Sequence, residues 1–243
     1  AHDVSLHVRD WQCDNCRGPA IVLLPGLGAN AYVFDGLAHA LAPRSRVIAV
    51  SRRGYGQSDK PLPVRTATEH YEVDTLVADL HALLDGLGLD RVVLAGHSIA
   101  GNELTRFAGR HPQRVRGLVY LDATFDHTRN PGTGGLPVPD NRLFREPVPN
   151  EEDGASMEAA IAYARRTVRH WSAPLEANLR DQLDPRPDGS VRLNTPAAVA
   201  DAMDTASHSF SPDYTPVRAL ALVATAMPGD IRDIFPDRKS TRL

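Results

Sequence analysis

A serine between an apolar run and a helical pattern is the residue of this sequence with the clearest chemical potential. Residues 92–108 read VVLAGHSIAGNELTRFA, so Ser98 directly follows the expected strand. A sharp turn here would lift the hydroxyl above a sheet and aim the N–H of Ile99 at the same point. Gly96 and Ala100 would let strand and helix approach closely. The pattern predicts a nucleophilic serine; an ordinary serine at a strand–helix turn is the alternative.

A glycine-containing loop after an earlier apolar run could supply a second hydrogen-bond donor. Residues 23–30 read LLPGLGAN, and a backbone with two glycines can approach a ligand closely. The N–H of Leu27 is therefore expected to join that of Ile99 in holding an oxyanion. A plain glycine-rich connection is the alternative.

Alternating strand and helix patterns must position these two segments. Buried strands are predicted by continuous apolar runs at residues 20–26, 46–51, 91–96, 115–123 and 217–224, and an edge strand by residues 5–11. Helices are predicted over residues 32–42, 74–88, 101–112, 156–171 and 195–206, the last with Thr195 as its N-cap. This α/β alternation predicts a mostly parallel, doubly wound sheet with helices on both faces. Its ligand site should lie outside the carboxyl ends of the strands.

The pattern is interrupted after residue 125. Residues 127–154 are rich in proline and glycine, and two helical segments follow before strand composition returns. We therefore predict a core formed by residues 1–125 and 211–243, with residues 126–210 as an inserted helical cap, or lid. The last strand of the sheet is expected to be absent, because residues 225–243 hold no further apolar run.

Taken together, these pieces resemble the α/β-hydrolase fold superfamily. The resemblance lies in VLLPGLGANAYVFDGLA at residues 22–38, VIAVSRRGYGQSDKP at residues 47–61, and the segment 76–123 that contains Ser98. It implies a cap that selects the substrate and a catalytic triad in the order serine, acid, histidine. Two departures are Ala100 in place of the last glycine of G-x-S-x-G, and Pro25 where the family's oxyanion loop often has histidine.

The resemblance implies two positions for the triad acid. Asp122 ends the strand after the serine-bearing helix, and Asp230 follows the next strand, which is the commoner place; Asp233 is a weaker third. A loop-capping carboxylate is the alternative role for Asp122, and a surface turn residue the alternative for Asp230.

The triad histidine has no candidate at the position that the family implies. It belongs in a loop after one more strand, but no histidine follows His208. We expect this chain to be a truncated version of a longer hydrolase, crippled by the loss of its base. Substitute bases at His127 or His208 are the alternative, and His97 is expected to pack beside the site.

These observations predict a serine hydrolase that acts on a small ester or related acyl substrate through an acyl-enzyme at Ser98. A serine at this position argues against the epoxide-hydrolase and haloalkane-dehalogenase branches of the family, which form their ester on a carboxylate. The alternatives are a C–C bond hydrolase, a peptidase or a haloperoxidase of the same fold, and a pseudoenzyme that binds a small ligand without catalysis.

Composition narrows the possible partners. The 243 residues are 42% hydrophobic and 23% charged with a net charge of −3, which predicts no nucleic-acid partner. No apolar run approaches the roughly 18 residues of a membrane span. Neither a metal nor an organic cofactor is implied. Cys13 and Cys16 are expected in a turn between two strands, with or without a disulfide, and oligomeric state and compartment stay open.

Overall fold

A six-stranded sheet organises the molecule, in the order β1-β3-β2-β4-β5-β8. The computed structural model describes residues 3–13, 15–124, 126, 128, 150–168 and 170–225. The strands are β1 (Val8–Trp11), β2 (Ile21–Leu24), β3 (Val47–Val50), β4 (Val92–His97), β5 (Val115–Leu121) and β8 (Leu220–Ala224). Only β1 among them runs antiparallel to its neighbour, which confirms the predicted, mostly parallel sheet.

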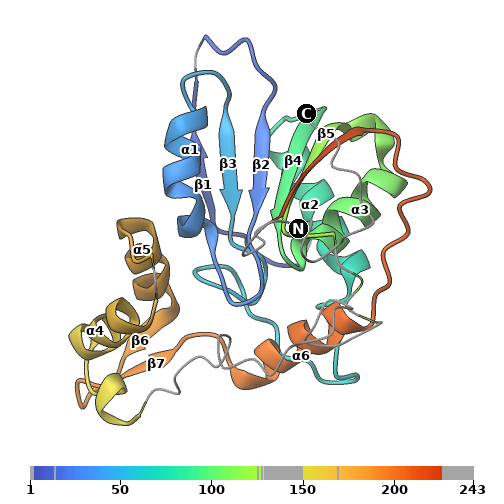
Figure 1. Cartoon of the computed structure of the whole chain (residues 1–243). Helices are drawn as coiled ribbons and strands as arrows, with labels where there is room; N and C mark the ends of the chain where they lie inside the picture. Colours follow the sequence, from blue (N-terminus) through green and yellow to red (C-terminus); the bar gives the residue numbers. More distant parts are fainter. Residues whose placement is uncertain are drawn as a thin grey trace, which may run out of the picture.

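Helices cover both faces of this sheet because its central strands are apolar on both sides. In β2, Val22 and Leu24 pack into one buried cluster with α2 (Val73–Gly86) and α3 (Ala100–Arg110). Leu23 points the other way, into a cluster with η1 (Ala31–Phe34) and α1 (Asp35–Leu41). Figure 1 shows α1 on one side of the strands and α2 and α3 on the other. This two-sided burial is the physical reason for the continuous apolar runs in the sequence.

A mixed insertion separates β5 from β8. Its described elements are η4 (Glu152–Gly154), α4 (Met157–Thr167), α5 (Ala173–Gln182), the hairpin of β6 (Leu183–Pro185) and β7 (Val191–Leu193), and α6 (Ala197–His208). Neither the hairpin nor α5 is predicted by the sequence patterns. In Figure 1 these elements lie beyond the arrowheads of β2 and β3, at the carboxyl ends of the parallel strands.

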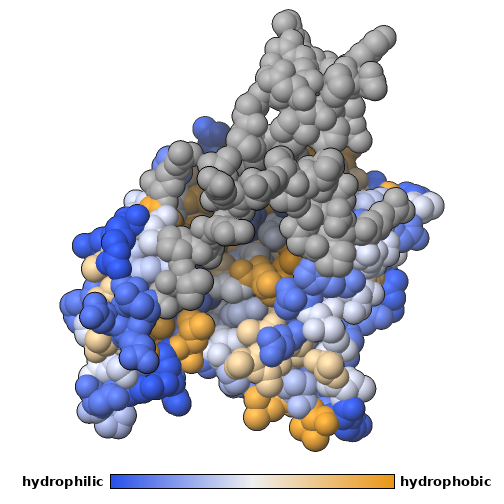
Figure 2. All heavy atoms as spheres, turned by 60° about the horizontal axis from the view of Figure 1, so that its bottom comes forward, coloured by the Kyte–Doolittle hydropathy of each residue, from blue (hydrophilic) through white to orange (hydrophobic). Residues whose placement is uncertain are grey.

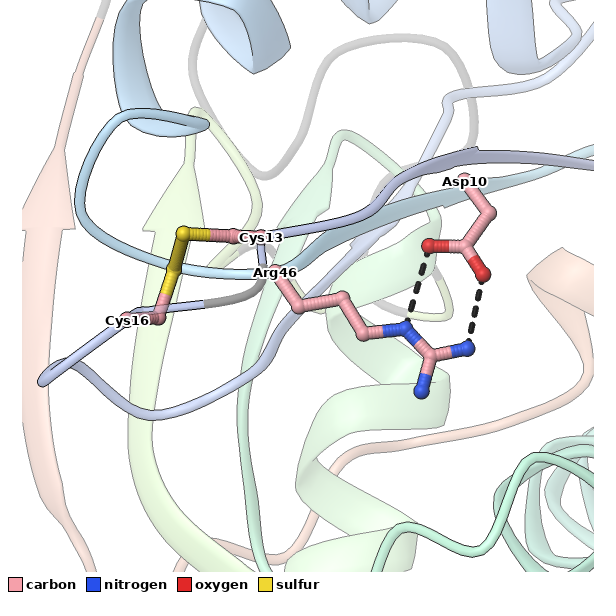
Figure 3. The surroundings of a disulfide bond; sticks show 4 residues. All are labelled: Asp10, Cys13, Cys16 and Arg46. Carbon is pink, nitrogen blue, oxygen red and sulfur yellow. Dashed lines mark hydrogen bonds and ion pairs between the residues drawn. A yellow bond between two sulfur atoms is a disulfide. The ribbon is translucent and has the colours of Figure 1, made fainter.

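The two cysteines lie at the amino ends of the parallel strands, opposite the end that carries Ser98. Trp11 at the end of β1 pairs with Val47 at the start of β3, so the chain after β1 turns at the amino ends of the parallel strands. There Cys13 and Cys16 are joined by a disulfide, close to the ion pair of Arg46 with Asp10 at 2.7 Å (Figure 3). None of the helices in the described ranges has the length and hydropathy of a membrane-spanning segment.

Candidate active site

Ser98 lies at the corner where β4 ends and α3 begins. Its φ is 53°, in the left-handed region that residues other than glycine rarely adopt. The N–H of Ser98 donates to the carbonyl oxygen of Leu121 at 3.1 Å, and the Ser98 carbonyl accepts from the N–H of Gly101 at 3.0 Å. The surrounding backbone therefore holds a tight, strained bend, which leaves the half-buried side chain at the carboxyl-end edge of the sheet.

The loop after β2 passes directly beside this corner. Leu24 pairs with Gly96 across the two parallel strands, so both chains leave the sheet at the same level. A Cβ atom on Gly26 would lie 3.2 Å from the Cβ of Ser98 and 2.8 Å from Nδ1 of His97. Only glycine allows so close an approach. The next residue, Leu27, therefore lies near the bend at Ser98.

The two predicted donors both have an N–H without an acceptor among the described residues. Leu27 is 39% exposed, and its N–H has no acceptor among the described residues. The N–H of Ile99 likewise has no acceptor, although Ile99 is only 8% exposed; it precedes the first residue of α3, where backbone donors lack helical acceptors. Backbone N–H groups without an acceptor are the kind of donor that stabilises a negative oxygen.

The tightest helix contact falls one residue later than the sequence pattern indicates. A Cβ atom on Gly101 would lie 1.7 Å from the carbonyl oxygen of Ala123, so only glycine fits there. At Gly96 the nearest atom to such a Cβ is Cδ1 of Leu104 at 2.8 Å, and the Cβ of Ala100 follows at 3.0 Å. The alanine at position 100 is thus accommodated, while the glycine after it is required.

Asp122 immediately follows β5, next to the Ser98 corner. Leu121 pairs with His97 in the sheet, so Asp122 lies beside Ser98 in the register. Its φ is 49°, and its N–H donates to the carbonyl oxygen of Ala224 at 2.6 Å. The Oδ1 atom is buried and has no hydrogen-bond partner in the part of the chain that the structure describes. The rival acid Asp230 lies outside the described residues, as do Asp233 and His127.

In the structure, the described histidines contact groups other than the Ser98 hydroxyl. His97 is exposed, yet the neighbouring atoms that partly desolvate its ring lower its pKa; the Asp122 charge opposes this shift and the Arg52 charge adds to it. His208 is in the last turn of α6, where its Nδ1 lies 2.9 Å from the carbonyl oxygen of Asp204 in the same helix. Within the described residues, no imidazole is hydrogen-bonded to the Ser98 hydroxyl.

The insertion is anchored to the loop that follows β2. The Asp181 carboxylate on α5 accepts from Nδ2 of Asn30 at 2.9 Å and from Nε2 of Gln57 at 2.7 Å. The N–H of Asn30 also donates to Oδ1 of Asn178 at 3.0 Å. Sequence periodicity does not detect this polar contact. Figure 2 turns this end of the molecule forward and shows apolar side chains in the middle of the face, with hydrophilic side chains mainly toward its left side.

The sheet and the serine corner together define the alpha/beta hydrolase fold, and comparison with known proteins agrees. The sequence profile described as alpha/beta hydrolase fold matches residues 19–143. The chain belongs to this family.

Its relatives include an uncharacterized protein of Mycobacterium tuberculosis (strain ATCC 25618 / H37Rv), 38% identical over 128 residues, which are 53% of this chain and 33% of that protein. The 2-(acetamidomethylene)succinate hydrolase of Mesorhizobium japonicum is 31% identical over 121 residues, which are 50% of this chain and 40% of the relative. The matches thus span well under half the length of these curated relatives.

A solved structure of the same kind of hydrolase shares the fold. The crystal structure of E-2-(acetamidomethylene)succinate hydrolase superposes with a TM-score of 0.68 over 90% of this chain and 76% of that chain, at 23% identity. At this identity the likeness concerns the fold alone.

Proposed function

We propose that the chain is a serine hydrolase that cleaves a small ester or related acyl compound through an acyl-enzyme at Ser98. One observation carries the proposal: Ser98 has a φ of 53° in a bend between a buried strand and a helix, and the glycine loop after β2 lies against it. A hydroxyl held outside the carboxyl ends of a parallel sheet, beside open backbone donors, is the arrangement that acyl transfer requires.

The chemistry follows from these positions. Oγ of Ser98 attacks the carbonyl carbon of the substrate while an imidazole base takes its proton, and the carbonyl electrons move onto the oxygen. The N–H groups of Leu27 and Ile99 donate to that oxyanion. Collapse expels the leaving group, which takes the proton from the imidazolium, and leaves an acyl-enzyme. In the second half-reaction the same base takes a proton from a water molecule as that water attacks the acyl carbon. The intermediate collapses, the proton returns to Oγ of Ser98, and the acid is released.

Two carboxylates compete to orient the imidazole in this scheme, and Asp122 has the better support. Its Oδ1 is buried beside the Ser98 corner and has no partner among the described residues, so it could accept a hydrogen bond from an imidazole N–H. Asp230 is the alternative acid. For the base, the candidates within the sequence are His127 and His208.

The relatives support the class of reaction. The Mesorhizobium japonicum protein is named as a hydrolase of 2-(acetamidomethylene)succinate, a small organic molecule. We infer a small-molecule substrate for this chain as well. A serine at the corner favours an acyl-enzyme over an ester formed on a protein carboxylate.

A fluorophosphonate probe tests the proposal, because it reacts with an activated serine. We expect intact-mass spectrometry to show one adduct, mapped to Ser98 by peptide sequencing and abolished in Ser98→Ala. Ser172→Ala, which changes an exposed serine at the start of α5, is the matched control and should label like the wild type. Wild-type protein that resists the probe would refute the hydrolase proposal.

One observation favours a second candidate if the probe fails. Within the described residues no imidazole reaches the Ser98 hydroxyl, so the site could bind a small ligand without cleaving it. Saturable binding of a short-chain ester without its hydrolysis, measured by calorimetry and chromatography, would support this non-catalytic role.

Asp122→Asn distinguishes the two candidate acids. Asparagine tolerates a positive φ as aspartate does, so the change removes the charge with little strain. If Asp122 orients the base, labelling should slow by about 10³- to 10⁴-fold, the loss expected when a triad acid is neutralised. An unchanged rate would transfer the role to Asp230, and Asp230→Asn should then show the loss.

A further inference from the structure

A buried ion pair links the two segments that carry the proposed oxyanion donors, the N–H groups of Leu27 and Ile99. Nη1 of Arg52, two residues after β3, donates to Oε1 of Glu103 at 3.0 Å, and the two side chains are only 4% and 3% exposed. Glu103 belongs to the first turn of α3, one helical turn after Ile99. Nη2 of Arg52 donates to the carbonyl oxygen of Pro25, the residue that begins the loop after β2.

This pair is an expensive feature for a core to keep. Removing two charges from water carries a large desolvation cost, and well-packed apolar residues often stabilise a core as well or better. Nε of Arg52 is moreover buried without a partner among the described residues, which adds to the cost. Stability alone therefore explains poorly why an arginine lies here.

The neighbouring arginine provides the contrast. Arg53 is 1% exposed and also pairs with a buried carboxylate on a helix, since its Nη2 donates to Oδ1 of Asp79 on α2 at 2.6 Å. Its other partner is Asp3 near the start of the chain, at 2.9 Å. The described contacts of Arg53 thus leave the loop after β2 untouched, whereas those of Arg52 reach both that loop and α3.

We propose that Arg52 is a positioning residue that fixes the two halves of the oxyanion hole relative to each other. One guanidinium holds the carbonyl of Pro25, two residues before the Leu27 N–H, and, through Glu103, the first turn of α3 that carries the Ile99 N–H. Only a planar fork with several donors bridges both partners at once. The inference rests on the proposed function of these two N–H groups.

The test removes the bridge without leaving a buried charge. The double variant Arg52→Met with Glu103→Leu replaces the pair by apolar side chains, a change that cores commonly tolerate. Its matched control is Arg53→Met with Asp79→Leu, which removes the similarly buried pair made by the neighbouring arginine, whose side chains are 1% and 8% exposed. Thermal unfolding reports the stability of each protein, so a loss of fold is recognised directly.

Two readouts then measure the position of the donors. In ¹H–¹⁵N correlation spectra, the amide signals of Leu27 and Ile99 should shift in the Arg52 double variant and stay in place in the Arg53 control. Fluorophosphonate labelling of Ser98 should slow by about 100-fold, the lower end of the loss caused by removing one oxyanion donor. The control should label at the wild-type rate.

A conservative variant completes the design. Arg52→Lys keeps the charge but offers one ammonium, which can hold either Pro25 or Glu103, so it should give an intermediate labelling rate; it also carries the test if the double variant does not fold. Unchanged Leu27 and Ile99 signals in a folded Arg52 variant would overturn the inference. If the wild type itself fails to label, the proposed function falls, while the amide signals still decide the role of Arg52.

Discussion

The contact between Gly101 and Ala123 gives the sharpest quantitative prediction for the serine corner. In Gly101→Ala, the new Cβ would start 1.7 Å from a backbone carbonyl oxygen, whereas real Cβ contacts essentially never fall below 3.0 Å. The shortfall is 3.0 − 1.7 = 1.3 Å, and no flexible side chain can absorb it. The first turn of α3 must therefore move away from the segment that carries Asp122.

The cost follows from two opposing terms. Overpacking a tight site costs about 1–3 kcal/mol, and a clash with backbone belongs at the upper end. Alanine gains back up to about 1 kcal/mol over glycine in a helix. The net loss is about 2 kcal/mol, which lowers the melting temperature of a chain of this size by about 4–8 °C.

Gly36→Ala in α1 isolates the favourable term. No atom lies within 4 Å of a Cβ at this position, so only the gain in helix propensity remains. Far-UV circular dichroism melts of both variants should place Gly101→Ala below the wild type and Gly36→Ala at or above it. If Gly101→Ala melted as high as Gly36→Ala, the close approach of α3 to residue 123 would be refuted.

Three further outcomes are expected away from this contact. Hydrogen bonds from the Arg65 N–H, a second backbone N–H and the Arg65 guanidinium lower the pKa of Glu69 from 4.5 to about 2. The contribution of Glu69 to stability is therefore complete above pH 4.5 and is lost as the pH falls toward 2. A carboxyl ¹³C titration midpoint near 4.5 would contradict this. Replacing both Cys13 and Cys16 with serine opens a small loop and should cost about 2 kcal/mol by the loop-entropy relation, yet leave Ser98 labelling unchanged, because the disulfide lies at the other edge of the sheet. Asp181→Ala removes the carboxylate that anchors α5 and should speed limited proteolysis within residues 150–208; an unaltered digestion pattern would show that the anchor is dispensable.

The central strands were predictable because burial on both faces leaves a local signature. The strand predicted as buried at residues 217–224 is wrong in that respect, because β8 (Leu220–Ala224) is exposed at every residue. The apolar run at residues 20–26 predicts a strand, and β2 spans Ile21–Leu24 with its last three residues buried. The run at residues 91–96 becomes β4, Val92–His97, in the same way. In these two strands the predicted and observed bounds differ by one or two residues, because hydrogen bonding and not composition decides where a strand ends.

The insertion was less predictable because its elements attach through polar, long-range contacts. α5 has no buried residue, so the sequence shows no apolar stripe that would predict this helix. The helix is held to Asn30 in the loop after β2 by hydrogen bonds that include the one to Asp181. The predicted N-cap at Thr195 is wrong: α6 begins at Ala197, and the Thr195 hydroxyl donates to the carbonyl oxygen of Gly54 at 2.8 Å. The Thr195 side chain thus bonds to a residue 141 positions away in the sequence and not to the first turn of its own helix.

Local hydrogen bonding also separates the two roles that the sequence leaves open for Asp122. Sequence alone leaves Asp122 open between a triad acid and a loop cap. A capping carboxylate accepts hydrogen bonds from nearby backbone N–H groups, as Glu69 does from Val64 and Arg65. Asp122 instead has a buried Oδ1 with no partner in the described chain, at a φ of 49°. An unpaired buried oxygen destabilises the fold by about 1–3 kcal/mol, and a loop cap gives no reason to keep it. The proposed triad role would account for it, because an imidazole beside Ser98 would supply the missing partner.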